Sequence, residues 1–208
     1  APVGAEVYLV GGVLRNIALG AQLAPDYDFS FNGDTKALAA SVAARLGAAF
    51  FALDEEAGAW RVVSKGPTLL TVDFTPTLGG DILVDLAKRD FTVNALALSI
   101  ARPFDAEPLV IDPFGGIKDA HARVLRKVSD SVFDDDPLRM MRAIRLSTQY
   151  RLDIEQETWE SLVSKSGLLS STSPERARDE LIRLFSCSRA STGVRLLCDS
   201  GLMEVLVP

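Results

Sequence analysis

The sequence has little of what several large enzyme classes need. Its 208 residues include a single histidine, His121, and two cysteines, Cys187 and Cys198. A zinc site built from several histidines is therefore excluded, and a serine or cysteine nucleophile activated by histidine would have to use His121. His121 lies in a polar stretch, so we expect a solvated surface side chain. The helical pattern around both cysteines favours buried thiols over a disulfide, which suits a reducing compartment.

Long apolar runs are also missing. No run reaches the ~18 residues that span a bilayer, and residues 1–9 lack the basic flank and long apolar stretch of a signal peptide. We therefore expect a cytoplasmic protein with no membrane partner, and nothing in the sequence indicates its oligomeric state. Hydrophobic residues make up 48% and charged residues 24% of the chain, which is the balance of a globular protein.

The net charge of −6 is distributed unevenly. Residues 1–88 carry 6 Lys and Arg against 10 Asp and Glu, whereas residues 118–151 carry 8 against 5. This pattern fits an acidic metal site followed by an element that binds a polyanion. It also fits ordinary surface charge, and charge taken alone favours that second interpretation.

Hydrophobic periodicity divides the chain into two parts. The first part mixes strands and helices without a regular alternation, and the second has only helical spacing. We expect strands at residues 6–10, 26–31, 59–64, 69–74 and 91–100, a turn at Gly66-Pro67, and helices at 13–19, 35–46, 136–150, 156–164, 174–187 and 192–199. The segment 91–100 also fits a helix. The fold class is therefore α+β, with a mixed domain at residues 1–122 and an all-helical domain at residues 123–208.

Two local patterns in the first domain could carry chemistry. Asp26 and Asp28 alternate with aromatic residues, so both carboxylates project from one face of a strand and could hold Mg²⁺. Acidic pairs on strands are more commonly a solvated face. Gly11-Gly12 precedes a helix, so backbone N–H groups could approach a phosphate there, with Arg15 one turn into the helix. A plain tight turn is the alternative.

A third pattern opens the helical domain. Arg139, Arg142 and Arg145 recur every three residues on one broad helical face, and Asp136 shares that face. Asp136 and Arg139 could form an intrahelical ion pair that contributes little to stability. They could instead hydrogen-bond the edge of a base, because a carboxylate accepts from amino groups and a guanidinium donates to ring nitrogens and carbonyls.

The order of these patterns resembles the class II tRNA nucleotidyltransferases, the family of the CCA-adding enzymes and the bacterial poly(A) polymerases. The residues that match its successive motifs are 11–16, 26–28, 89–95, 112–119, 135–139 and 173–180. The resemblance implies a polymerase-β-type nucleotidyltransferase head followed by a helical neck. The implied activity is template-independent transfer of CMP, AMP or both from CTP and ATP to the 3′ end of tRNA, with Mg²⁺ as the cofactor.

The resemblance also assigns roles to individual residues. The pair Asp26 and Asp28 would be catalytic and would bind two Mg²⁺ ions. The triphosphate would contact the glycine turn and its helix, and the ribose and phosphates would contact residues from the third motif. The base would be selected by the first residues of the neck. The implied nucleotide-binding residues are Gly11, Gly12, Arg15, Arg89, Asp90, Asn94, Asp136, Arg139 and Arg142. Residues 112–119 would form a springy connection between head and neck.

Three features differ from the usual family pattern. Asn16 stands where an aspartate usually follows Arg15 and could orient it, and Asp135 stands where a glutamate is usual. The helical body and tail that grip tRNA are not found within the 208 residues, so we expect a head-and-neck portion.

The short segment 75–88 resembles the corresponding segment of CC-adding or A-adding members. Residues 61–70 lack the Arg- and His-containing segment of poly(A) polymerases. Polyadenylation of general RNA and a nucleotide-binding module without catalysis, which Asn16 would suit, remain alternatives.

Overall fold

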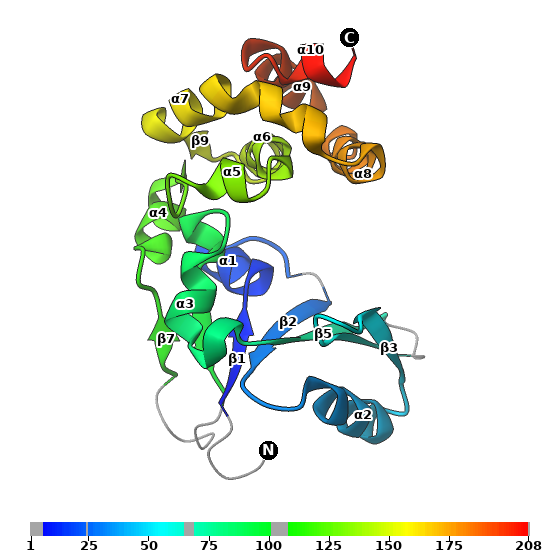
Figure 1. Cartoon of the computed structure of the whole chain (residues 1–208). Helices are drawn as coiled ribbons and strands as arrows, with labels where there is room; N and C mark the ends of the chain where they lie inside the picture. Colours follow the sequence, from blue (N-terminus) through cyan, green and yellow to red (C-terminus); the bar gives the residue numbers. More distant parts are fainter. Residues whose placement is uncertain (1–5, 24, 65–68, 101–107, 208) are drawn as a thin grey trace. The chain divides into compact units, whose positions relative to one another are not determined.

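The computed structural model describes residues 6–23, 25–64, 69–100 and 108–207, which form two compact units (Figure 1). The first unit comprises Ala1–Ala87 and Asn94–Ile117, and the second comprises Lys88–Val93 and Lys118–Pro208. The chain therefore passes from one unit to the other three times. The expected turn at Gly66-Pro67 lies outside the described residues.

The described part of the first unit contains a seven-stranded sheet of order β3-β4-β5-β2-β1-β6-β7. Every neighbouring pair is antiparallel except β2 and β5, which are parallel. The strands are β1 (Val7–Val10), β2 (Asp26–Phe31), β3 (Ala49–Asp54), β4 (Ala59–Val63), β5 (Thr71–Pro76), β6 (Ala97–Ser99) and β7 (Val110–Ile111). This mixed sheet confirms the predicted α+β class.

Helices α1 (Gly12–Leu19) and α2 (Thr35–Leu46) cover the aromatic face of β2. Tyr27 packs with residues of α1, and Phe29 packs with the core under α2. The Asp34 side chain caps α2, and glycines in the left-handed conformation end both helices. Because successive strand residues alternate, Asp26 and Asp28 lie on the opposite face of β2. A short helix, α3 (Ile82–Ala87), follows β5 in the chain.

The second unit is mainly helical and is centred on one buried helix, α6. Its side chains Met140, Ile144 and Leu146 are almost fully buried. At Gly193, an added Cβ atom would lie 2.5 Å from Leu184 Cδ1, so the glycine allows α9 to pack closely. The helices are α4 (Gly116–Ala122), which begins in the first unit, α5 (Val132–Asp135), α6 (Leu138–Tyr150), α7 (Gln156–Lys165), α8 (Pro174–Phe185), α9 (Ala190–Asp199) and α10 (Leu202–Leu206). Within the described ranges, no helix is long and apolar enough to cross a membrane.

Several sequence predictions needed correction. The predicted strand at 91–100 is wrong in its first half, where Thr92–Asn94 form a 3₁₀ turn and only Ala97–Ser99 form a strand. The residues of this segment are buried whichever way they point, so the sequence shows a continuous apolar run. Such a run does not distinguish a strand from a turn. The helical domain also contains a two-stranded parallel pair, β8 (Val124–Leu125) and β9 (Asp153–Ile154).

The cysteine prediction was correct in one respect and wrong in another. Cys187 and Cys198 are both free thiols, as expected. Neither is buried, however, because Cys187 is half-buried and Cys198 is exposed near the end of α9. Partial burial raises the pKa of the Cys187 thiol. His121 is exposed, as its polar surroundings predicted.

Candidate active site

A row of paired residues crosses four strands of the sheet. Val10 on β1 is opposite Asp28 on β2, Asp28 is level with Asp73 on β5, and Asp73 is opposite Arg61 on β4. Paired residues project from the same face of a sheet, so Asp28, Asp73 and Arg61 lie side by side. Gly11 directly follows Val10, and strand pairing therefore brings the predicted carboxylate next to the predicted glycine turn.

Arg61 and Asp73 form a two-pronged ion pair within this row. The Arg61 Nε and Nη2 atoms donate to the two Asp73 carboxylate oxygens at 2.7 and 2.6 Å. The hydrogen bonds that Arg61 donates to Asp73 raise the pKa of Arg61, and the nearby charges of Asp26 and Asp28 act in the same direction. The guanidinium thus lies within the field of three carboxylates and offsets part of their mutual repulsion.

Sequence reasoning missed both members of this pair, although a signal was present. Arg61 is a charged residue between buried Trp60 and Val62, and Asp73 lies between buried Val72 and Phe74. Charged residues on the alternate face of two strands could have marked them. Knowing that they meet required the strand order.

Asp26 and Asp28 provide a donor set that fits a hard cation. Asp26 is exposed and Asp28 is partly exposed, so their carboxylates are accessible. Mg²⁺ prefers oxygen ligands, and proteins commonly hold it with one or two carboxylates while phosphates and water supply the rest. Over the described residues there is no group of three or more His, Cys, Asp or Glu side chains suited to a metal.

The glycine turn is held against an ordered arginine. Gly11 has φ 75°, which favours glycine, and a Cβ atom at Gly12 would lie 3.3 Å from Arg15 Nη2. Arg15 is buried and donates from Nη1 to Asn94 Oδ1 at 2.7 Å. Its Nε and Nη2 atoms donate to Asn16 Oδ1 at 3.2 and 3.0 Å. The structure thus brings Arg15 and Asn94 together, with the neutral Asn16 amide orienting the guanidinium.

A second group of predicted residues meets within the second unit. Arg142 Nε lies 2.6 Å from the buried Asp90 carboxylate, which also accepts from the Phe91 N–H at 2.8 Å. Arg139 Nη2 donates to the Lys88 carbonyl oxygen at 2.8 Å. The segment that carries Asp90 is therefore fastened to one face of α6. Arg89, half-buried, lies between these two contacts in the chain.

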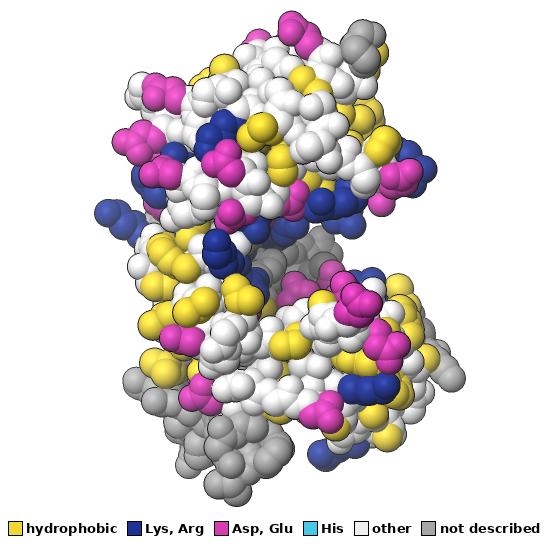
Figure 2. Space-filling model, viewed as in Figure 1, with side chains coloured by type: hydrophobic (Ala, Val, Ile, Leu, Met, Phe, Trp, Pro, Cys, Tyr) yellow, Lys and Arg dark blue, Asp and Glu magenta, His cyan; other side chains and the backbone are white. Residues whose placement is uncertain are grey.

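Asp136 forms an ion pair with α8, which decides against one of the two interpretations left open by the sequence. Its Oδ2 atom lies 2.8 Å from Arg176 Nη2 of α8, so the intrahelical Asp136–Arg139 pair is wrong. The buried Arg145 and Glu180 form an ion pair between α6 and α8 at 2.5 Å. Asp136 itself is extended and directly precedes α6, so the helix predicted at 136–150 begins two residues later, at Leu138. The residues matching the last motif thus contact Asp136 and α6. Figure 2 shows Lys and Arg side chains gathered over the second unit with Asp and Glu among them.

The two ends of the segment 112–119 are each anchored. Asp112 accepts from the N–H groups of Gly116 and Ile117 at 2.7 and 3.0 Å, which caps α4 within the first unit. Asp119 accepts from Thr92 Oγ1 at 2.7 Å and Arg126 Nε at 3.1 Å within the second. The predicted springy connection stays a prediction, and these contacts define its two anchors.

The first unit therefore combines accessible paired carboxylates with a glycine turn, a helix N-terminus and an oriented arginine. Such an arrangement has the chemistry to bind a nucleoside triphosphate together with a divalent cation. The second unit adds a charged, hydrogen-bonded helix face. Together these features define a nucleotidyltransferase-type α+β head joined to a helical domain.

The chain belongs to the family described as "Poly A polymerase head domain", whose model matches residues 7–126. A second model, described as "Probable RNA and SrmB- binding site of polymerase A", matches residues 151–208. Enzymes of this family typically use a divalent metal.

Curated relatives and solved structures agree with this assignment. A CC-adding tRNA nucleotidyltransferase of Geobacter sulfurreducens is 40% identical over 96% of this chain and 45% of its own length. An A-adding tRNA nucleotidyltransferase of Deinococcus radiodurans is 39% identical over 100% of this chain and 46% of its own. A Thermotoga maritima CCA-adding enzyme complexed with tRNA superposes with a TM-score of 0.87 at 30% identity, over 99% of this chain and 49% of that one. The chain thus spans about half the length of these relatives.

Proposed function

We propose that this chain is the head and neck of an enzyme that adds CMP, AMP or both to the 3′ end of tRNA without a template. The head would comprise residues 1–122 and the neck residues 123–208. The observation that carries the proposal is the pairing of Asp28 with Val10, which puts a carboxylate beside the Gly11 turn. Similarity to CC-adding and A-adding tRNA nucleotidyltransferases supports this substrate. The reaction would take place in the cytoplasm, where tRNA is found.

In this proposal, the first unit binds the reacting groups. Asp26 and Asp28 hold Mg²⁺, which when bound neutralises phosphate charge and favours deprotonation of the attacking 3′-hydroxyl. The N–H groups at Gly11 and Gly12 and the guanidinium of Arg15 bind the triphosphate, because a helix N-terminus and a fixed cation both favour an anion. The contacts from Asn16 and Asn94 keep that guanidinium in one orientation before the nucleotide binds.

The second unit would select the base. Cytosine and adenine both present an exocyclic amino group beside an unprotonated ring nitrogen. A carboxylate that accepts and a guanidinium that donates match this pair, whereas uracil and guanine present a carbonyl beside an N–H. Asp136 would supply the acceptor, and Arg139 the donor. Two of the five guanidinium N–H groups of Arg139 contact carbonyl oxygens, so others are left for a base.

A second candidate function is polyadenylation of general RNA. It is favoured by the family descriptions, which name poly(A) polymerase and an RNA-binding site. The absence from residues 61–70 of the Arg- and His-containing segment favours tRNA instead. The same experiment separates the two.

The test is incorporation of labelled CMP and AMP with excess protein, on tRNA that lacks its CCA end and on an unrelated RNA of equal length. We expect Mg²⁺-dependent incorporation on the tRNA alone and at least a hundredfold loss in Asp28→Ala. Glu56→Ala, which removes an exposed carboxylate from the same unit, is the matched control and should behave as the parent. Equal labelling of both RNAs with AMP would favour polyadenylation, and near-normal activity of Asp28→Ala would refute the carboxylate assignment.

A further inference from the structure

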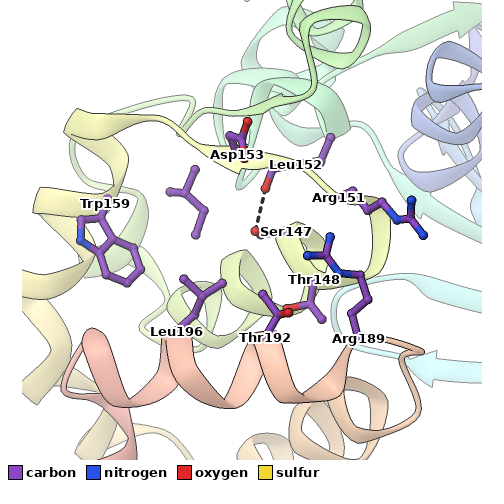
Figure 3. A pocket seen from close by; sticks show the side chains of 10 residues that line it. Ser147, Thr148, Arg151, Leu152, Asp153, Trp159, Arg189, Thr192 and Leu196 are labelled. Atoms are coloured by element: carbon purple, nitrogen blue, oxygen red, sulfur yellow. Dashed lines mark hydrogen bonds between the residues drawn. The ribbon is translucent and has the colours of Figure 1, made fainter.

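A cavity of about 380 Å³ lies in the second unit, away from the residues assigned to nucleotide binding (Figure 3). It is bordered by the end of α6, by β9, and by α7 and α9. Its volume falls in the range of small-ligand pockets. Arg151 and Arg189 line one part of it, and Figure 3 shows Trp159 at the opposite side from Arg151.

The two arginines differ from most others in the second unit. Arg126, Arg142, Arg145 and Arg176 all form ion pairs with carboxylates. Neither the Arg151 nor the Arg189 side chain has a hydrogen bond or ion pair with any residue of the described chain. The acidic side chain lining the cavity is that of Asp153, so the lining carries a net positive charge. The site is therefore suited to an anion.

The backbone at Arg151 provides an independent argument. Arg151 ends α6 with φ 56° and ψ 52°, a left-handed conformation in which glycine or asparagine is the usual residue. Bulky side chains adopt this region rarely, and strained residues cluster at binding sites. An arginine at this position puts a guanidinium at the cavity at some conformational cost. A role in ligand binding accounts for that choice.

The neutral groups of the lining fit the rest of a nucleotide. The half-buried Trp159 ring offers a face on which a base of any kind can stack. The hydroxyls of Ser147 and Thr148 donate to backbone carbonyls and are already used, whereas Thr192 Oγ1 has no partner within the described residues. A phosphodiester between two guanidinium groups, a base against an indole and a hydroxyl for the ribose match this arrangement.

We propose that this cavity binds one nucleotide of an RNA strand, with its phosphate between Arg151 and Arg189 and its base on Trp159. The proposal rests on the proposed function in that RNA is taken as the substrate, and the match of residues 151–208 to an RNA-binding family model agrees with it. It adds a contact to the RNA that is separate from the site that binds the incoming nucleotide.

The test measures binding of fluorescein-labelled tRNA lacking its CCA end to the 208-residue chain over a range of salt concentrations. Arg151→Gly retains the left-handed backbone and removes the guanidinium, and Arg189→Ala removes the second one. Each change should weaken binding roughly 3- to 10-fold, and each should lower the slope of log K against log salt by about 0.7–0.9. Arg195→Ala is the control, because Arg195 is an exposed arginine of α9 that does not line the cavity.

Trp159 is tested by a matched pair of substitutions. Trp159→Phe keeps an aromatic face and should bind within about twofold of the parent, whereas Trp159→Leu should bind several-fold more weakly. Thermal unfolding of each variant separates lost binding from lost folding. Calorimetric titration with CTP and ATP should give parental affinities in every variant, and incorporation by the parent tests the proposed function separately.

Three results would overturn the inference: no binding of this RNA by the parent, parental binding by the Arg151→Gly, Arg189→Ala double variant, or an equal loss in Arg195→Ala. Failure of nucleotide incorporation with pocket-dependent RNA binding intact would count against the proposed function alone.

Discussion

Gly12 and Arg15 are in close contact in the first unit. The guanidinium folds back over the first turn of α1, where a Cβ atom at Gly12 would approach Nη2 to 3.3 Å. Contacts this short require the neighbour to move. Arg15 is already held by Asn94 and Asn16, so movement would weaken a hydrogen bond between side chains. The glycine is therefore required by the arginine as well as by the turn.

Gly12→Ala should weaken nucleotide binding without harming the fold. Because alanine favours a helix, the free energy of unfolding should either rise or fall by no more than about 1 kcal/mol. The Kd for CTP and ATP should increase about tenfold, equivalent to ~1.4 kcal/mol, through displacement of Arg15. Calorimetric titration in Mg²⁺ measures the change. Gly167→Ala is the control, because a Cβ atom there meets no atom within 4 Å and its affinity should be parental.

Asn16 allows the role of the missing aspartate to be measured. Its Oδ1 atom accepts from Arg15 and its Nδ2 atom donates to the Gln22 carbonyl oxygen at 3.0 Å. If orientation of Arg15 is the whole role, Asn16→Asp should keep nucleotide affinity within about threefold, because a carboxylate accepts the same hydrogen bonds more strongly. Asn16→Leu should raise the Kd about tenfold through loss of an ionic hydrogen bond. A large gain in incorporation by Asn16→Asp would instead show that the carboxylate does more than orient the arginine.

Among individual residues, local sequence patterns predicted the two carboxylates and the glycine turn of the site. Strand alternation placed Asp26 and Asp28 on one face, and the Gly11-Gly12 dipeptide before a helix indicated the turn. The roles of these residues are untested, whereas their local structure is confirmed. The Arg61–Asp73 pair could not be predicted, because its members are joined by the pairing of β4 with β5.

Glu180 of α8 forms two ion pairs of different kinds, one with α6 and one within its own helix. Arg145 and Glu180 are both buried, whereas Arg183 reaches the same Glu180 carboxylate at 4.0 Å from an exposed position. Removing one member of a buried pair leaves an uncompensated charge, and removing an exposed member changes little. The two partners of Glu180 therefore allow the effect of a buried ion pair to be compared with that of an exposed one.

Glu180→Ala should lower the free energy of unfolding by about 3 kcal/mol, because Arg145 would stay buried without its carboxylate. Arg183→Ala should change it by less than about 0.5 kcal/mol. The Arg145→Met, Glu180→Leu double variant should recover most of the loss, because no charge is left unpaired. Urea denaturation followed by circular dichroism measures all three. A double variant as unstable as the single would show that the pair itself, rather than the orphaned charge, stabilises the helices.

Elements with strong local signals were predicted well, and those defined by tertiary pairing were not. The strand at 26–31 and the helix at 35–46 have the predicted bounds, because alternation, an Asp cap and a terminal glycine mark them. Strand β3 was missed because most of its residues are exposed, so no alternation of burial marks it. β8 and β9 are two residues each and exist through pairing with each other.

At the scale of the molecule, the segment 88–93 is the unusual feature. It is flanked by residues of the first unit on both sides, yet it belongs to the second. Phe91 is fully buried and pairs in a β-bridge with Lys127, and Asp90 is held by Arg142. The helical unit is therefore completed by a piece of chain from within the head sequence. A single boundary could be drawn from periodicity, but this insertion could not.

The consequence is testable with two fragments, residues 118–208 and residues 88–208. The shorter fragment lacks Phe91, and loss of a buried phenylalanine leaves a cavity that costs about 3–5 kcal/mol. It also leaves Arg142 without the Asp90 carboxylate. We expect the longer fragment to unfold in one cooperative transition, and the shorter one to be less stable by several kcal/mol and to bind a hydrophobic dye. Phe91→Ala in the longer fragment should reproduce most of the loss, which excludes a nonspecific effect of chain length. Equal stability of the two fragments would mean that residues 118–208 form a complete core alone, and that the segment 88–93 is bound to this unit without stabilising it.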